Sequence, residues 1–162
     1  MASDEIIPFD ANTYTAEMNA YLMDLNDTIV GANATLDLSP LTEAIATFAA
    51  AASDVTALRD QAVSFSDSAL IDVVNHKLRD FSRGFVSQGG LPGREFYRHV
   101  INAPGQDTGY APVTYPGITE AVQAGNITLA EEWVGKTARG IVVAAGILST
   151  EGIPAGGYIE RG

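Results

Sequence analysis

One short stretch of the sequence gathers the side chains best suited to bind an anion. Residues 89–105 begin and end with glycine and carry Arg94, Tyr97, Arg98 and His99. An arginine guanidinium binds a carboxylate through two parallel hydrogen bonds, and a tyrosine hydroxyl adds a donor. Two interpretations follow: a carboxylate contact, or a set of braces in which the arginines bond backbone carbonyls and helix ends. We favour bracing, because buried polar groups in proteins are almost always hydrogen-bonded within the fold.

Outside this stretch the sequence holds no recognisable catalytic or metal-binding set. There are no cysteines, and the two histidines, His76 and His99, form no HExxH pattern. A Gly-x-Ser-x-Gly elbow and a Walker-type phosphate loop are both missing from the sequence. The adjacent Glu131 and Glu132 are interpreted as a solvated helix face or as charge at a helix N-terminus. We therefore expect no catalytic residue, no metal and no cofactor in this chain.

Three asparagines begin Asn-x-Thr triplets, the acceptor sequence for N-glycosylation. They are Asn26, Asn33 and Asn126. Asn33 and Asn126 fall at breaks between predicted helices, where an acceptor should be exposed. Because the triplet is common by chance, it shifts the expectation only modestly toward a secretory compartment.

The composition is that of one acidic domain. The 162 residues are 46% hydrophobic, which suits a single buried core and argues against disorder. Nine basic residues stand against 20 acidic ones, a net charge of −11, whereas nucleic acid and anionic membranes both require a basic face. No apolar run approaches the roughly 20 residues of a spanning helix, and residues 1–5 do not resemble a signal peptide. We expect a soluble piece with no nucleic-acid partner and no direct membrane contact.

Apolar residues recur at the three- and four-residue spacing of amphipathic helices. After an N-terminal arm over residues 1–9, we predict four long helices and one short one. The long helices run from about 11 to 29, 40 to 62, 70 to 85 and 129 to 148, and the short one from about 118 to 123.

The helix ends carry capping residues and breakers. Asp10, Ser39 and either Asn126 or Thr128 are predicted N-caps. The Gly89-Gly90 pair is predicted to end the third helix in a left-handed cap.

Four amphipathic stripes are buried most simply against one another in a helical bundle. The predicted fold is all-α: a four-helix bundle over residues 10–149, with a long ordered loop between the third and fourth long helices. Residues 150–162 are predicted to form an irregular tail. No strand is expected, because the best candidate, Val113-Thr114-Tyr115, is too short.

The loop motif resembles a known family. Residues 90–104 read GLPGREFYRHVINAP, and they are followed by Gly109-Tyr110-Ala111 and Tyr115-Pro116-Gly117-Ile118. This pattern resembles the C-terminal helical domain shared by glutamate carboxypeptidase II and the transferrin receptor, the transferrin receptor-like dimerisation domain. The resemblance extends over about residues 6–149.

The resemblance implies a setting for the chain. Such a bundle follows a protease-like domain and an apical domain in one polypeptide, and it forms homodimers. The parent proteins are typically type II membrane proteins, so this domain is expected to be luminal, vacuolar or extracellular. In the carboxypeptidase branch two zinc ions are held by the protease-like domain, and none of their ligands belongs to the helical domain. The alternative is a non-catalytic parent similar to the transferrin receptor.

The resemblance also implies roles for individual residues. A Lys-Tyr pair in the family binds the carboxylates of a C-terminal glutamate; Tyr110 matches the tyrosine, but Gly109 stands at the lysine position. Losing that ammonium group puts the preference for glutamate in question. Residues expected to brace the loop are Arg94, Tyr97, Arg98, His99, Pro116 and Gly117. Two other departures are Ser82, in place of the family's usual glutamate, and Asn102, where a tyrosine is common.

Overall fold

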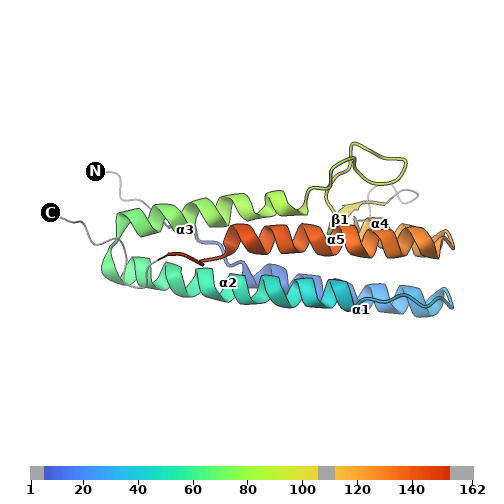
Figure 1. Ribbon diagram of the computed structural model, residues 1–162, viewed down its shortest axis with the longest axis horizontal. Coiled ribbons are helices and arrows are strands. Elements are labelled where there is room, and N and C mark those ends of the chain that lie inside the picture. The colour runs from blue at the N-terminus through green and yellow to red at the C-terminus, as the bar shows by residue number, and fades with distance from the viewer. Residues whose placement is uncertain (1–5, 106–111, 154–162) are drawn as a thin grey trace.

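Four long helices form an elongated bundle in the computed structural model, which describes residues 6–105 and 112–153 (Figure 1). The helices α1, α2, α3 and α5 run along the bundle, and a loop stands out from it beside α4 and a small strand pair. The elements, in chain order, are α1 (Asn12–Gly31), α2 (Ser39–Phe65), α3 (Ser68–Asp80), the 3₁₀ helix η1 (Phe81–Phe85), β1 (Asn102–Pro104), β2 (Pro112–Thr114), α4 (Pro116–Gln123) and α5 (Ile127–Leu148). The predicted all-α bundle is confirmed.

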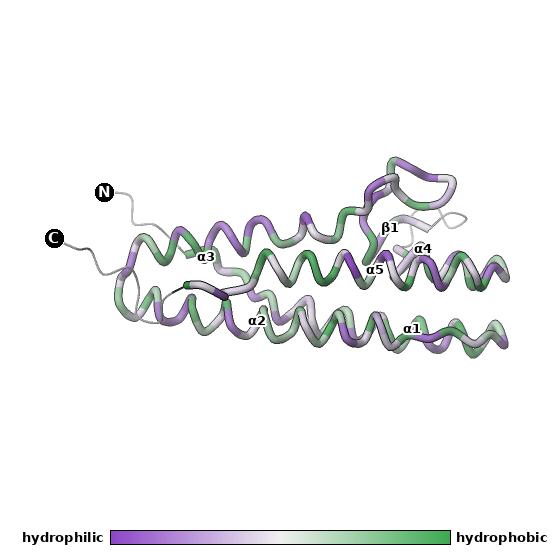
Figure 2. The backbone as a smooth tube through the Cα atoms, in the orientation of Figure 1, coloured by the Kyte–Doolittle hydropathy of each residue, from purple (hydrophilic) through white to green (hydrophobic). Residues whose placement is uncertain are grey.

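The core lies between α2 and α5, the two helices that contact each other most extensively. The predicted inner stripe of α5 is buried throughout, from Trp133 to Leu148, and so is that of α2 from Leu41 to Leu58. In Figure 2 polar and apolar colours alternate along both helices, as expected when only one side of each faces the core. Alanines in these stripes, such as Ala52 and Ala144, let the helix backbones approach closely.

The helix α2 has the length and composition of a membrane-spanning helix, contrary to the expectation from the sequence. Within the described ranges it is the one helix that does so, with a mean hydropathy of 1.2 in its most apolar window. Core helices of soluble proteins pass the same test, and the apolar stripe of α2 is buried against the other helices. Length and composition therefore do not assign α2 to a membrane.

Two predicted N-caps are wrong by one residue, and a third is confirmed. Backbone geometry places the caps of α1 and α2 at Ala11 and Leu38, and neither makes a side-chain capping bond. Carboxylates just before the two helices accept backbone hydrogen bonds instead. Asp10 accepts one from the Asn12 N–H, and Asp37 accepts one from the Ser39 N–H, both at 2.9 Å. The predicted cap Asn126 is confirmed, since its Oδ1 accepts a hydrogen bond from the Leu129 N–H at 3.1 Å.

The third helix ends earlier than predicted. Helix α3 stops at Asp80, and the chain tightens into η1 before Val86 adopts an extended backbone. Within η1, Gly84 approaches the backbone of Ala144 in α5 so closely that there is no room for a side chain. Gly89 and Gly90 have the predicted positive φ angles, +93° and +74°, but they shape the loop rather than end a helix.

Two short strands form where none was expected. Strands β1 and β2 pair antiparallel, with Asn102 opposite Thr114 and Pro104 opposite Pro112. Three-residue strands carry no readable alternation, so this pairing depends on contacts distant in the sequence. The pair fixes both ends of the segment 105–111.

Candidate functional site

The segment from Val86 to Gly105, here called the 86–105 loop, is held in shape by its own backbone. At its base the Ser87 N–H donates to the Arg98 carbonyl at 2.7 Å, and the Val100 N–H donates to the Phe85 carbonyl at 2.9 Å. Nearer the tip the Leu91 N–H donates to the Tyr97 carbonyl at 2.8 Å. These bonds make the loop an ordered projection of the bundle.

Glycine is required at one point of this loop. Gly90 has a φ of +74°, and a Cβ placed there would lie 2.3 Å from the carbonyl oxygen of Glu95. The chain therefore doubles back on itself so closely that a side chain at position 90 would collide with backbone.

Arg94 joins the loop to two other elements. Its Nη1 donates to the carbonyl oxygen of Pro104 in β1, and its Nη2 lies 2.5 Å from Oε1 of Glu120 in α4. Both side chains are largely buried, with 13% and 15% of their surface exposed. The Nε of Arg94 is buried and has no hydrogen-bond partner among the described residues. Only the two terminal nitrogens of the guanidinium contact Pro104 and Glu120. Arg94 is occupied within the fold and is not presented as a free anion ligand.

Arg98 and the neighbouring aromatic residues point outward. The Arg98 side chain is exposed and makes no hydrogen bond or ion pair with another residue in the described ranges. Phe96 is 95% exposed and Tyr97 is 43% exposed, with the Tyr97 ring beneath the Arg94 guanidinium at 5.4 Å. Arg94 and Arg98, predicted as a local concentration of charge, therefore have separate environments.

His99 faces the bundle. Its ring lies 5.7 Å from that of Phe85, and its Nδ1 accepts a hydrogen bond from the Asn102 N–H at 3.3 Å. Burial lowers the pKa of the imidazole below its usual value, because the charged form loses hydration there. A neutral imidazole at physiological pH suits packing rather than anion binding.

Tyr115 is an anchor that sequence reasoning missed. It is fully buried, has a left-handed backbone with φ of 44°, and donates its hydroxyl to the Met18 carbonyl of α1 at 2.8 Å. Burial strongly raises the pKa of its hydroxyl, which stays protonated. Pro116 and Gly117 then start α4, and Gly117 lies against the Trp133 ring, where a Cβ would approach to 2.3 Å. The Pro116-Gly117 pair is the one signal in the sequence that a helix starts here. Nothing in the sequence indicates that Tyr115 has a left-handed backbone or is buried.

Gly109 and Tyr110, the residues matched to the family's Lys-Tyr pair, lie outside the described residues. Their flanks are described: Pro104 pairs with Pro112 across β1 and β2, and Arg94 bonds the Pro104 carbonyl. The braced loop and the strand pair thus determine where this segment leaves and rejoins the fold.

The other predicted sites lie outside residues 86–105 of the sequence. The three glycosylation acceptors Asn26, Asn33 and Asn126 are all exposed. His76 contacts the carboxylate of Asp72 at 3.3 Å, four residues earlier on α3. The described part of the chain contains no group of three or more His, Cys, Asp or Glu side chains placed to hold a metal ion.

Comparison with known proteins gives consistent matches. The family model of the transferrin receptor-like dimerisation domain matches residues 36–149. A probable glutamate carboxypeptidase of Arthroderma benhamiae is 48% identical over 152 residues, which cover 93% of this chain and 21% of that protein. A probable glutamate carboxypeptidase of Arabidopsis thaliana is 28% identical over 75% of the chain and 17% of its own length. An inactive zinc metalloprotease of Schizosaccharomyces pombe is 28% identical over 85% of the chain and 18% of its length. The chain thus spans about a fifth of the length of these relatives.

Proposed function

The chain belongs to the transferrin receptor-like dimerisation domain family, and we propose that it is the homodimerisation domain of a glutamate carboxypeptidase-like zinc peptidase. The observation that carries this proposal is the family match over residues 36–149, joined with relatives about five times longer that are named probable glutamate carboxypeptidases. In this proposal the domain is not catalytic by itself. Catalysis, with two zinc ions, belongs to the parent's protease-like domain, and the helical domain completes the substrate pocket.

Self-association is the first expected result. At high protein concentration, light scattering should give about twice the monomer mass of 17.0 kDa. A concentration series provides the control, because a reversible dimer dissociates on dilution while a misfolded aggregate does not. A mass of one chain at every concentration would contradict dimerisation by this domain alone.

Pocket completion makes a separate prediction in the longer protein. Replacing Gly109 with lysine is expected to raise the preference for C-terminal glutamate over C-terminal glutamine at least about tenfold in kcat/KM. The physical reason is that a charge-assisted hydrogen bond to a carboxylate contributes about 1.5–3 kcal/mol. Gly109→Met is the matched control, since it adds similar length without charge. An equal gain from methionine would show that side-chain bulk, rather than carboxylate recognition, is responsible.

The location of the protein is part of the same proposal. A membrane-anchored parent with this domain luminal, vacuolar or extracellular would expose Asn26, Asn33 and Asn126 to the glycosylation machinery. We expect the protein from its native source to shift to lower mass on gels after peptide N-glycosidase treatment. Replacing all three acceptors with glutamine should reduce that shift, and an untreated protein of unmodified mass would contradict the proposal.

A second candidate is a non-catalytic dimerisation module. It is favoured by one observation: a relative 28% identical to the chain is named an inactive zinc metalloprotease. The zinc ligands of the parent's protease-like domain separate the two candidates, because they are present only in an active peptidase.

A further inference from the structure

We propose that a cationic groove at the base of the 86–105 loop docks an acidic, partly apolar segment from the remainder of the longer polypeptide. The groove is a cavity of about 440 Å³ between η1, the first residues of the loop and α5. The inference rests on the proposed function, because the docking segment belongs to the parent protein.

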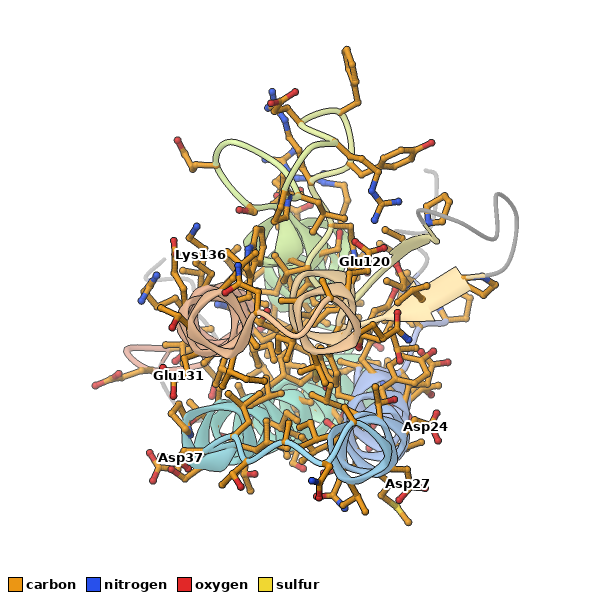
Figure 3. All side chains as sticks on the ribbon, turned by 90° about the vertical axis from the view of Figure 1, so that its right-hand side faces the viewer. Asp24, Asp27, Asp37, Glu120, Glu131 and Lys136 are labelled. Carbon is orange, nitrogen blue, oxygen red and sulfur yellow. The ribbon has the colours of Figure 1, made fainter. Side chains whose placement is uncertain are left out.

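The charge of the groove is opposite to that of the chain. Arg83 from η1 and Lys136 and Arg139 from α5 line it, three of the nine basic residues in a chain of net charge −11. No carboxylate is among its lining residues. Figure 3 shows Lys136 on the side of the bundle that carries the loop, together with Glu120, which is paired with Arg94. Asp24, Asp27 and Asp37 lie on the opposite side. Such a separation favours an acidic partner on this face.

The three cations differ in how far they are already neutralised. Lys136 lies 2.6 Å from Oε1 of Glu132 and over the Trp133 ring at 4.8 Å. Arg83 pairs with Asp80 at 3.3 Å, but its side chain is 77% exposed, so this pair is strongly screened. Arg139 has no ion pair with any residue in the described ranges. The Arg139 guanidinium, together with that of Arg83, is therefore available to bind an incoming carboxylate through two hydrogen bonds.

The walls of the groove favour a peptide segment over a small anion. Val86 and Val143 line it while 49% and 55% exposed, with the buried Val100 beneath them. A small polar anion would leave these valines in water, whereas a segment with alternating acidic and apolar residues would cover them and meet the arginines.

Photo-crosslinking in the longer polypeptide tests this docking directly. Gln88 lines the groove and is exposed, so p-benzoylphenylalanine placed there should not disturb the core. We expect it to crosslink to a segment of the same polypeptide rich in Asp and Glu. The same photoreactive residue at Gln123, exposed at the end of α4 and outside the groove, is the matched control.

Charge reversal supplies the second readout. The double variant Arg83→Glu and Arg139→Glu should lower the crosslink yield from position 88 about tenfold, because like charges would then face each other. The yield from position 123 should stay unchanged. No crosslink, a crosslink to a second copy of the chain, or a yield insensitive to charge reversal would each overturn the inference. Light scattering on the same sample reports dimerisation independently, so failure of the docking and failure of the dimer are distinguishable.

Discussion

Replacing Gly84 with alanine is expected to lower the free energy of unfolding by about 3 kcal/mol. A Cβ at this position would lie 2.3 Å from the backbone nitrogen of Ala144, 2.6 Å from its Cα and 2.8 Å from its Cβ. Backbone atoms of a packed helix cannot rotate away as the end of a long side chain can, so η1 and α5 would have to separate. Urea unfolding followed by circular dichroism at 222 nm, at a fixed protein concentration, measures the change.

Gly146 offers the matched control. It lies on the exposed side of α5, and a Cβ there would meet nothing within 4 Å. Because glycine lowers helix stability by about 0.5–1 kcal/mol relative to alanine, Gly146→Ala should stabilise the protein slightly. Equal stability of Gly84→Ala and the unsubstituted protein would show that η1 does not pack against α5 as closely as described.

The packing of η1 on α5 shows both what sequence patterns predict and what they do not. The stripe from Trp133 to Leu148 was readable because helical periodicity reports which face is apolar, and that face is buried. The end of the third helix was not readable, since the η1 turn that follows it packs through Gly84 against Ala144, sixty residues away. Local patterns predict a helix and its inner face, whereas its end depends here on what it packs against.

In the candidate site, too, local backbone features could be predicted from the sequence, whereas contacts between distant residues could not. Glycines with positive φ at positions 89 and 90 agree with the predicted left-handed backbone, because only the local chain is involved. The partners of Arg94 are Glu120 and the Pro104 carbonyl, and the residue type alone could not choose them from other acceptors. Tyr115 packs on α1 through a bond to Met18, 97 positions earlier, which no spacing rule predicts. Sequence therefore located the loop but not the contacts that hold it.

Replacing Arg94 with methionine should lower the free energy of unfolding by about 2–3 kcal/mol and loosen the loop. The substitution leaves the Glu120 carboxylate, 15% exposed, without its cationic partner, and the Pro104 carbonyl without its donor. Breaking a fully buried pair costs about 3–5 kcal/mol, so a pair with some solvent access should lie just below that range. Urea unfolding measures the loss. Amide hydrogen exchange at Leu91 and Tyr97, which are bonded within the loop, reports its loosening.

Two further variants separate the ion pair from general effects of the substitution. Arg98→Met makes the same side-chain change four residues later, at an exposed site without a partner among the described residues, and should change stability by less than about 0.5 kcal/mol. Arg94→Met combined with Glu120→Leu removes both charges and should recover part of the loss, because the orphaned carboxylate causes much of it. If Arg94→Met and Arg98→Met were equally mild and the loop amides kept their protection, Arg94 would not brace the loop. A loss confined to Arg94→Met, with faster exchange at Leu91 and Tyr97, would instead make the Arg94–Glu120 contact the link between the loop and α4.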